Sequence, residues 1–165
     1  MIKTICNDNT HCITVFDEHF MGVFHSPIDI SPFIPGQLPD KSFIKFNTSA
    51  IWDTGASGTV ITQEVVNELK LKQTGIEIVN TASETGIVAP SFGIELSFGT
   101  NLRLVIRRAV LGKTKSGIDC LIGMDVISMG DFSITNYESK PCMSFRIPSK
   151  HRIDYVINPH INSTE

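Results

Sequence analysis

Hydrophobic and polar residues alternate over several short stretches of this chain, and turn-forming residues separate these stretches. Successive side chains of a strand point to opposite faces, so a period of two predicts strands with one buried face. Six strands are predicted: Phe43–Trp52, Gly75–Val79, Ile94–Phe98, Leu102–Ile106, Asp131–Ile134 and Met143–Ile147. Hairpin turns are expected at 98–102 and across 136–141, where glycine, asparagine or proline interrupts the apolar residues.

The clearest helical pattern covers Thr62–Lys72. Thr62 is a residue type that caps helices, Glu64 lies in the first turn, and apolar residues return at a partly helical spacing. Many short strands, with turns about every 8–12 residues and only one or two short helices, predict an all-β fold shaped as a small barrel.

The first forty residues are predicted to form an irregular extension, because prolines concentrate there and break helices and interior strands. A strand within the extension is expected at Thr14–Phe16 or at Gly22–Phe24. The extension either wraps the body, joins a dimer sheet or is mobile. We therefore expect an extension at 1–40, a main domain at 41–150 and a tail at 151–165.

The most informative segment is five residues long and lies between the apolar pairs 51–52 and 60–61. It reads Asp53-Thr54-Gly55-Ala56-Ser57. An acidic residue followed by a hydroxyl, a glycine and a small residue indicates a carboxylate on a tight turn at the end of a strand. Taken alone, the segment fits an ordinary Asx turn as well as a catalytic loop.

A second segment, Cys120–Ile127, decides between these two interpretations. Its pattern is that of a short buried strand, then Gly123, then an apolar pattern suited to a short helix. Together the two segments resemble the retropepsin-like aspartic proteases: the retroviral protease, similar bacterial proteins and a domain of the DNA-damage-inducible ubiquitin-shuttle proteins. In that family an Asp-Thr/Ser-Gly-Ala motif is followed, after a flap hairpin, by the pattern that Leu121–Asp125 fits. The resemblance covers about Phe43 to Ile147.

The resemblance implies a closed, barrel-like acid-protease fold with a flap hairpin, assembled as a two-fold homodimer. It implies that Asp53 is catalytic and that each subunit supplies one copy, because peptide hydrolysis needs two carboxylates and the chain has one Asp-Thr-Gly. Two carboxylates that share a proton provide both the base that activates water and the acid that protonates the substrate carbonyl.

Further roles follow from the same resemblance. Thr54 is expected to hydrogen-bond across the two-fold axis, and Gly55 to let the substrate approach the backbone. The substrate-binding residues that it implies are Ala56, Ser57, Ala82, Ser83, Glu84, Thr85, Gly86 and Leu121. Asp125 is expected to be structural, opening the short helix and hydrogen-bonding to backbone.

The segment Asn80–Val88 stands where the family has its flap. Small and polar residues dominate its middle, as expected of a hairpin that must open to admit a peptide. In the flap interpretation its backbone pairs with an extended substrate. An ordinary surface hairpin is the alternative interpretation.

Three residues depart from the family pattern. Trp52 replaces the usual aliphatic residue. Ser57 and Met124 replace an acidic residue and an arginine that form an ion pair in retroviral members. Because both partners of that pair are absent, no charge is left unpaired, and the base of the dimer must be built differently.

Composition excludes several other classes of function. A net charge of −3 and a pI near 5.9 give no sign of a nucleic-acid partner. No apolar stretch approaches the length of a membrane span, and the N-terminus lacks the apolar core of a signal peptide, so a cytoplasmic location is expected.

The sequence predicts no metal and no organic cofactor, since water is the nucleophile. The cysteines lack the paired spacing of a zinc site, and the histidines all lie in the terminal extensions. The cysteines are Cys6, Cys12, Cys120 and Cys142. The function expected is that of an aspartic endopeptidase; the alternative is a non-catalytic module of the same fold that dimerises or binds peptides.

Overall fold

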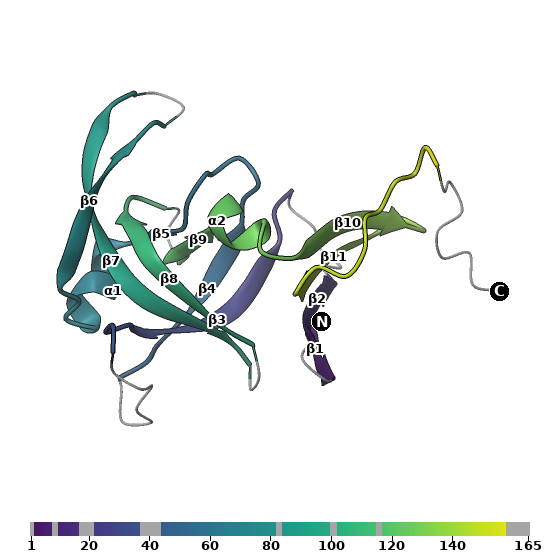
Figure 1. Cartoon of the computed structure of the whole chain (residues 1–165), viewed down its shortest axis with the longest axis horizontal. Helices are drawn as coiled ribbons and strands as arrows, with labels where there is room; N and C mark the ends of the chain where they lie inside the picture. The colour runs from purple at the N-terminus through teal and green to yellow at the C-terminus, as the bar shows by residue number, and fades with distance from the viewer. Residues whose placement is uncertain are drawn as a thin grey trace.

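The computed structural model of the chain describes residues 2–7, 10–16, 22–36, 44–81, 84–99, 102–114 and 117–157. These residues form mostly β-structure with two short helices (Figure 1). The elements in chain order are β1 (Ile2–Asn7), β2 (Thr10–Phe16), β3 (His25–Pro32), β4 (Phe46–Trp52), β5 (Val60–Ile61), α1 (Gln63–Glu68), β6 (Gln73–Val79), β7 (Ile87–Phe98), β8 (Leu102–Leu111), β9 (Cys120–Ile122), α2 (Met124–Ile127), β10 (Asp131–Tyr137) and β11 (Lys140–Ile147).

Six strands close a barrel. They neighbour one another in the order β3, β4, β9, β5, β8 and β7, and β7 pairs back with β3. β4 and β9 run parallel, as do β5 and β8, whereas the other barrel pairs are antiparallel. β6 pairs with β7 on the edge opposite β8, and the two strands form a hairpin. The expected all-β barrel with short helices is confirmed.

Alternating side chains fill the barrel. In β8, for example, Leu102, Leu104 and Ile106 are buried, whereas Arg103 and Val105 between them are exposed. Removing one apolar face of each strand from water is the main stabilising contribution to such a closed sheet. The predicted period of two is therefore the pattern that the barrel requires.

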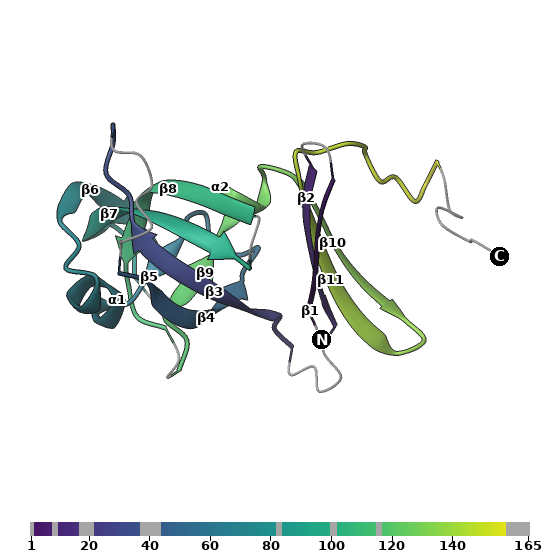
Figure 2. The ribbon, with the colours of Figure 1, turned by 90° about the horizontal axis from the view of Figure 1, so that it is seen from below.

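A second, four-stranded antiparallel sheet stands at one end of the barrel, in the order β1, β2, β11 and β10 (Figure 2). Its buried face includes Ile13 of β2 and Phe145 of β11, which lie opposite each other in the register. Phe145 contacts Trp52 at the end of β4, with 5.1 Å between ring centroids. This aromatic contact joins the four-stranded sheet to the barrel.

The expectation of an irregular segment at 1–40 is wrong for the described residues, which include β1, β2 and the barrel strand β3. Of the two expected strands, Thr14–Phe16 is part of β2, whereas Gly22–Phe24 is not a strand. Strand β3 tolerates its two prolines because Pro27 lies where β3 has only β4 as a neighbour, and because Pro32 is the last residue of β3. The division into extension, domain and tail remains a prediction.

The helix predicted at 62–72 is shorter in the structure. α1 ends at Glu68 because Lys70 adopts a left-handed conformation, with φ at 49°. Thr62 precedes the helix, but its hydroxyl donates to Asp119 Oδ1 at 3.0 Å instead of capping the backbone. None of the described helices is long and apolar enough to cross a membrane.

The predicted strands from 46 onward are confirmed, and β7 and β8 extend beyond the predicted ranges to 87–98 and 102–111. Phe43 lies outside the described residues. The hairpins are confirmed by register, because Phe98 lies opposite Leu102 and Asn136 lies opposite Pro141.

The carboxylate of Asp131 ties the segment after β11 to the start of β10. It pairs with Arg146 and accepts hydrogen bonds from the Ser149 hydroxyl and from the Lys150 backbone N–H at 2.9 Å. Burial alone would raise the pKa of Asp131, but these hydrogen bonds and the Arg146 charge hold its pKa well below the usual range.

Candidate active site

The Asp53 turn begins where β4 ends. The Asp53 N–H donates to the carbonyl of Ile122 in the neighbouring strand at 2.9 Å. The Gly55 N–H then donates to Asp53 Oδ1 at 2.8 Å, and the Ala56 N–H donates to the Asp53 carbonyl at 3.3 Å. The carboxylate is therefore fixed by its own turn, and the turn is fixed by β9.

The two segments that carry the sequence motif lie side by side. β4 and β9 are parallel, and Trp52 is the register partner of Ile122. The Met124 N–H donates to the Ala56 carbonyl at 2.8 Å. A Cβ on Gly123 would lie 2.5 Å from the backbone carbon and oxygen of Gly58. Glycine is needed at Gly123 because two backbones meet there without room for a side chain.

Asp125 has a structural set of contacts, as predicted. Its Oδ1 accepts hydrogen bonds from the buried Thr59 hydroxyl at 2.9 Å and from the Val126 N–H at 3.0 Å. These bonds connect the start of α2 to Thr59, which lies between the Asp53 turn and β5. Asp125 is not among the residues that line the pocket beside Asp53.

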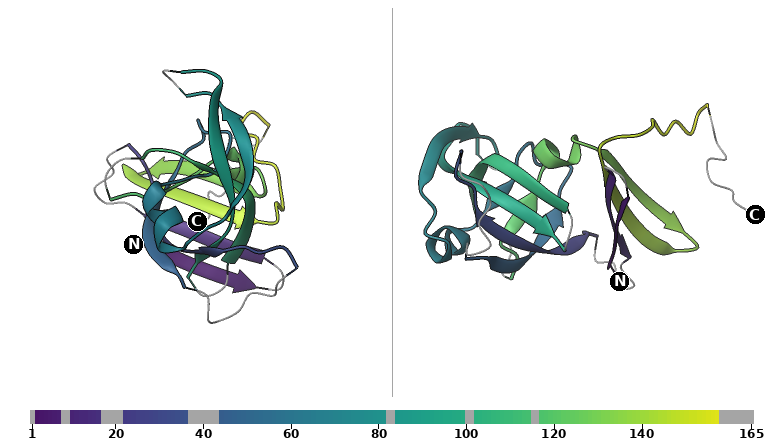
Figure 3. Two further views of the ribbon diagram at one scale, coloured as in Figure 1. Left: turned by 90° about the vertical axis from the view of Figure 1, so that its left-hand side faces the viewer. Right: turned by 60° about the horizontal axis from the view of Figure 1, so that its bottom comes forward.

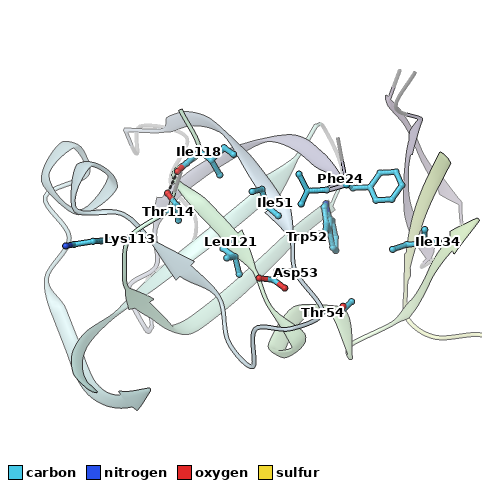
Figure 4. A pocket seen from close by; sticks show the side chains of 12 residues that line it. Phe24, Ile51, Trp52, Asp53, Thr54, Lys113, Thr114, Ile118, Leu121 and Ile134 are labelled. Carbon is cyan, nitrogen blue, oxygen red and sulfur yellow. Dashed lines mark hydrogen bonds between the residues drawn. The ribbon is translucent and has the colours of Figure 1, made fainter. Parts of the chain in front are cut away.

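A pocket of about 540 Å³ lies beside Asp53, and its volume is within the usual range of small-ligand sites. Its lining residues are Gly22, Val23, Phe24, Ile51, Trp52, Asp53, Thr54, Lys113, Thr114, Ile118, Leu121 and Ile134. Figure 4 shows Asp53 between Leu121 and Thr54, with Lys113 toward one end of the pocket and Ile134 toward the other. The walls are mostly apolar, and Asp53 is the acidic residue among them.

The structure brings only part of the predicted set to this pocket. Asp53, Thr54 and Leu121 line it, whereas Gly55, Ala56 and Ser57 continue the turn outside the lining. Sequence reasoning missed Phe24, Lys113, Ile118 and Ile134. No local pattern marks these four residues, because only the tertiary fold brings their segments together.

The predicted flap is the hairpin of β6 and β7, which extends away from the barrel (Figure 3). Near its tip the Gly86 N–H donates to Asn80 Oδ1 at 2.9 Å, and Gly86 has a φ of 70°. Glu84, Thr85 and Gly86 are exposed and do not line the pocket. Ala82 and Ser83 lie outside the described residues.

Among the described residues, the side chains that bear on metal or thiol chemistry include two cysteines, Cys120 and Cys142, whose thiol pKa is raised. Within this part of the chain, no group of three His, Cys, Asp or Glu side chains is placed to hold a metal ion. Burial, and then the charges of Asp125 and Asp119, raise the pKa of the Cys120 thiol far above its ordinary value. Burial also raises the pKa of Cys142, against a hydrogen bond with Thr135 that lowers it. Both thiols therefore stay protonated and poorly nucleophilic.

Comparison with known proteins agrees with this geometry. No curated protein matches the chain. Among solved structures it is similar to a retropepsin-like aspartic protease from Rickettsia conorii, with 17% sequence identity and a TM-score of 0.51. That similarity covers 88% of this chain and 100% of the other, and it shows the fold. The family model described as aspartyl protease matches residues 44–126, just over half of the chain, which include Asp53 and Asp125. The chain therefore belongs to the aspartyl protease family and has the retropepsin-like fold.

Proposed function

We propose that this protein is an aspartic endopeptidase that works as a homodimer, with water activated between the Asp53 carboxylates of the two copies. The observation that carries this proposal is the placement of Asp53. Its carboxylate is fixed by the Gly55 N–H at the end of β4 and borders a largely apolar pocket of about 540 Å³. One chain brings one carboxylate to this pocket, and the chemistry needs two.

The mechanism follows from the repulsion between two close carboxylates. The pair retains one proton at moderately acid pH, because two carboxylates within hydrogen-bonding reach repel each other when both are ionised. The ionised member takes a proton from water, which attacks the substrate carbonyl. The protonated member donates to the carbonyl oxygen as the tetrahedral intermediate forms.

The exposed surface around the turn supports a two-fold assembly. Thr54, Gly55 and Ser57 are exposed in the single chain beside the partly buried Asp53. A two-fold axis brings the same surface of each copy together, so an axis next to Asp53 pairs both carboxylates and both Thr54 hydroxyls. Ser57 and Met124 are exposed and uncharged, so such an interface would bury no unpaired charge from them.

The flap belongs to the same proposal. The exposed hairpin tip, which includes Glu84, Thr85 and Gly86, is available to pair with an extended peptide. We assign Ala56, Ser57 and Leu121, together with the predicted flap residues Ala82–Gly86, to substrate binding. The cytoplasmic location expected from the sequence is also part of this proposal, and fractionation of cells that express the tagged protein tests it.

The experiment is incubation of the purified protein with a mixed peptide library from acid to neutral pH, with cleavage read by mass spectrometry. Wild-type protein should cleave, with a bell-shaped kcat/KM and a maximum between roughly pH 4 and 6.5. Asp53→Asn should lose activity by several orders of magnitude while its circular dichroism spectrum is unchanged. A folded wild-type protein that cleaves nothing would contradict the proposal and favour the non-catalytic module.

A further inference from the structure

Strand β10 of the four-stranded sheet turns two side chains, Phe132 and Ile134, toward the barrel. Phe132 is the register partner of Phe145, and Ile134 is the partner of Met143. Phe145 and Met143 are fully buried. Cross-strand partners share a face of the sheet, and residues two apart do as well. Phe132 and Ile134 therefore belong to the face that packs on the barrel.

Phe132 reaches the residue next to Asp53. Its ring lies in a stacked arrangement on Trp52, with 5.8 Å between centroids and 24° between planes. Trp52 is buried, and Phe98 of the barrel contacts it with 5.6 Å between ring centroids. Offset and tilted aromatic contacts of this kind add a stabilising free energy beyond that from the burial of their apolar area.

Trp52 is also fixed by two polar contacts. Its indole N–H donates to the buried Ser26 hydroxyl at 2.9 Å, and its backbone N–H donates to the Phe24 carbonyl at 3.1 Å. The ring therefore has little freedom on its barrel side. On the other side its position depends on Phe132 and Phe145 of the four-stranded sheet. Because Asp53 is the next residue, a shift of Trp52 would displace the start of the turn that fixes the Asp53 carboxylate.

Ile134 reaches the pocket itself. Although its side chain is on the barrel-facing side of the sheet, the residue remains 56% exposed. It lines the same pocket as Asp53 and Thr54 and lies toward the end away from Lys113 (Figure 4). An exposed branched apolar side chain at the wall of this pocket favours contact with an apolar side chain of the ligand.

We propose that β10 is an active-site strand: Phe132 is a positioning residue that orients Asp53 through Trp52, and Ile134 is a specificity-determining residue that contacts an apolar substrate side chain. This inference rests on the proposed peptidase function and extends it to a sheet outside the barrel. Small errors in the placement of a reacting group lower the rate of the chemical step, whereas a lost apolar contact weakens substrate binding. The two residues should therefore affect different kinetic constants.

The test compares variants of β10 in the full-length protein, using a peptide that the wild-type enzyme cleaves. Phe132→Leu should lower kcat by about 3- to 10-fold and leave KM within about twofold, and Phe132→Tyr, which keeps the ring, should restore kcat. Ile134→Ala should raise KM by about 3- to 10-fold for substrates with a bulky apolar side chain and leave kcat nearly unchanged. Ser133→Ala, on the opposite face of the same strand, is the control and should match wild type.

Four outcomes would overturn the inference. If Phe132→Leu lowers only the melting temperature and leaves kcat unchanged, Phe132 has a purely structural role. If sedimentation shows that Ile134→Ala dissociates a dimer while KM of the remaining dimer is unchanged, Ile134 is an interface residue. A wild-type protein that cleaves no peptide refutes the proposed function and this inference with it, whereas cleavage that no β10 variant alters refutes this inference alone.

Discussion

The contact between Gly123 and Gly58 allows a quantitative prediction for Gly123→Ala. An added Cβ would lie 2.5 Å from the carbon and oxygen of the Gly58 peptide and 2.9 Å from its nitrogen. These are backbone atoms, so no side-chain rotation relieves the overlap. Gly123 has an extended conformation, with φ at −94°, so the cost comes from lack of space and not from backbone strain.

Overpacking of this kind costs about 1–3 kcal/mol of unfolding free energy. For a chain of this size, that corresponds to a drop in Tm of roughly 2–12 °C. The chain offers a matched control, because Gly58→Ala adds the same methyl group where nothing lies within 4 Å and where φ is not left-handed. Gly58→Ala should leave Tm within about 2 °C of wild type.

The assay is thermal unfolding followed by circular dichroism for both variants, with peptide cleavage measured well below each Tm. Gly123→Ala should also lower kcat, because relief of the overlap displaces the segment that holds Asp53 through the Met124–Ala56 hydrogen bond. If both alanine variants have the same Tm, the close backbone approach at Gly123 does not exist in solution.

Three further predictions follow from single contacts. Asp125→Asn should keep kcat/KM within about threefold, because an amide oxygen still accepts from Thr59 and Val126; a loss as large as that of Asp53→Asn would contradict its structural role. Asp131→Asn should lower stability at pH 6, and the difference from wild type should shrink between about pH 4 and pH 2 in urea titrations. The pKa of Asp131 is lower in the folded protein than in the unfolded chain, so its ionised carboxylate stabilises the folded protein at pH values above the unfolded-state pKa. This stabilisation is lost as the pH falls toward the folded-state pKa. Ser26→Ala should cost about 1–3 kcal/mol in the same titrations, because it leaves the buried indole N–H of Trp52 without its acceptor; an unchanged midpoint would refute that contact.

The sequence was sufficient for the parts of the site that depend on short-range patterns. A carboxylate, a hydroxyl and a glycine between two strands predict the Asp53 turn, and the apolar pair before Gly123 predicts β9. The structure shows why these two patterns occur together, since β9 supplies the carbonyl that accepts the Asp53 N–H. Periodicity of two likewise predicted three of the six barrel strands, β4, β7 and β8, whereas β3 and β5 were missed.

The parts that were missed depend on contacts between distant segments. Pro27 and Pro32 suggested irregular structure, yet the strand tolerates both because of where its neighbours begin and end. Alternation in β10 predicted a strand, but nothing local shows that Phe132 lies on Trp52 or that Ile134 reaches the pocket of Asp53. Such placements follow from how the two sheets pack, which sequence patterns do not encode.

The central claim is that each active site is built from the Asp53 residues of two copies, and mixing subunits tests it most directly. Wild-type protein is equilibrated with a roughly ninefold excess of Asp53→Asn, and peptide cleavage is measured per wild-type chain. If subunits exchange at random and each site needs two Asp53 carboxylates, about one tenth of the activity should remain. A matched excess of Ser133→Ala, whose side chain is on the outward face of β10, should leave activity per chain undiminished. Activity per wild-type chain that stays constant in excess Asp53→Asn, with exchange confirmed by mass spectrometry of mixed dimers, would contradict a shared carboxylate pair.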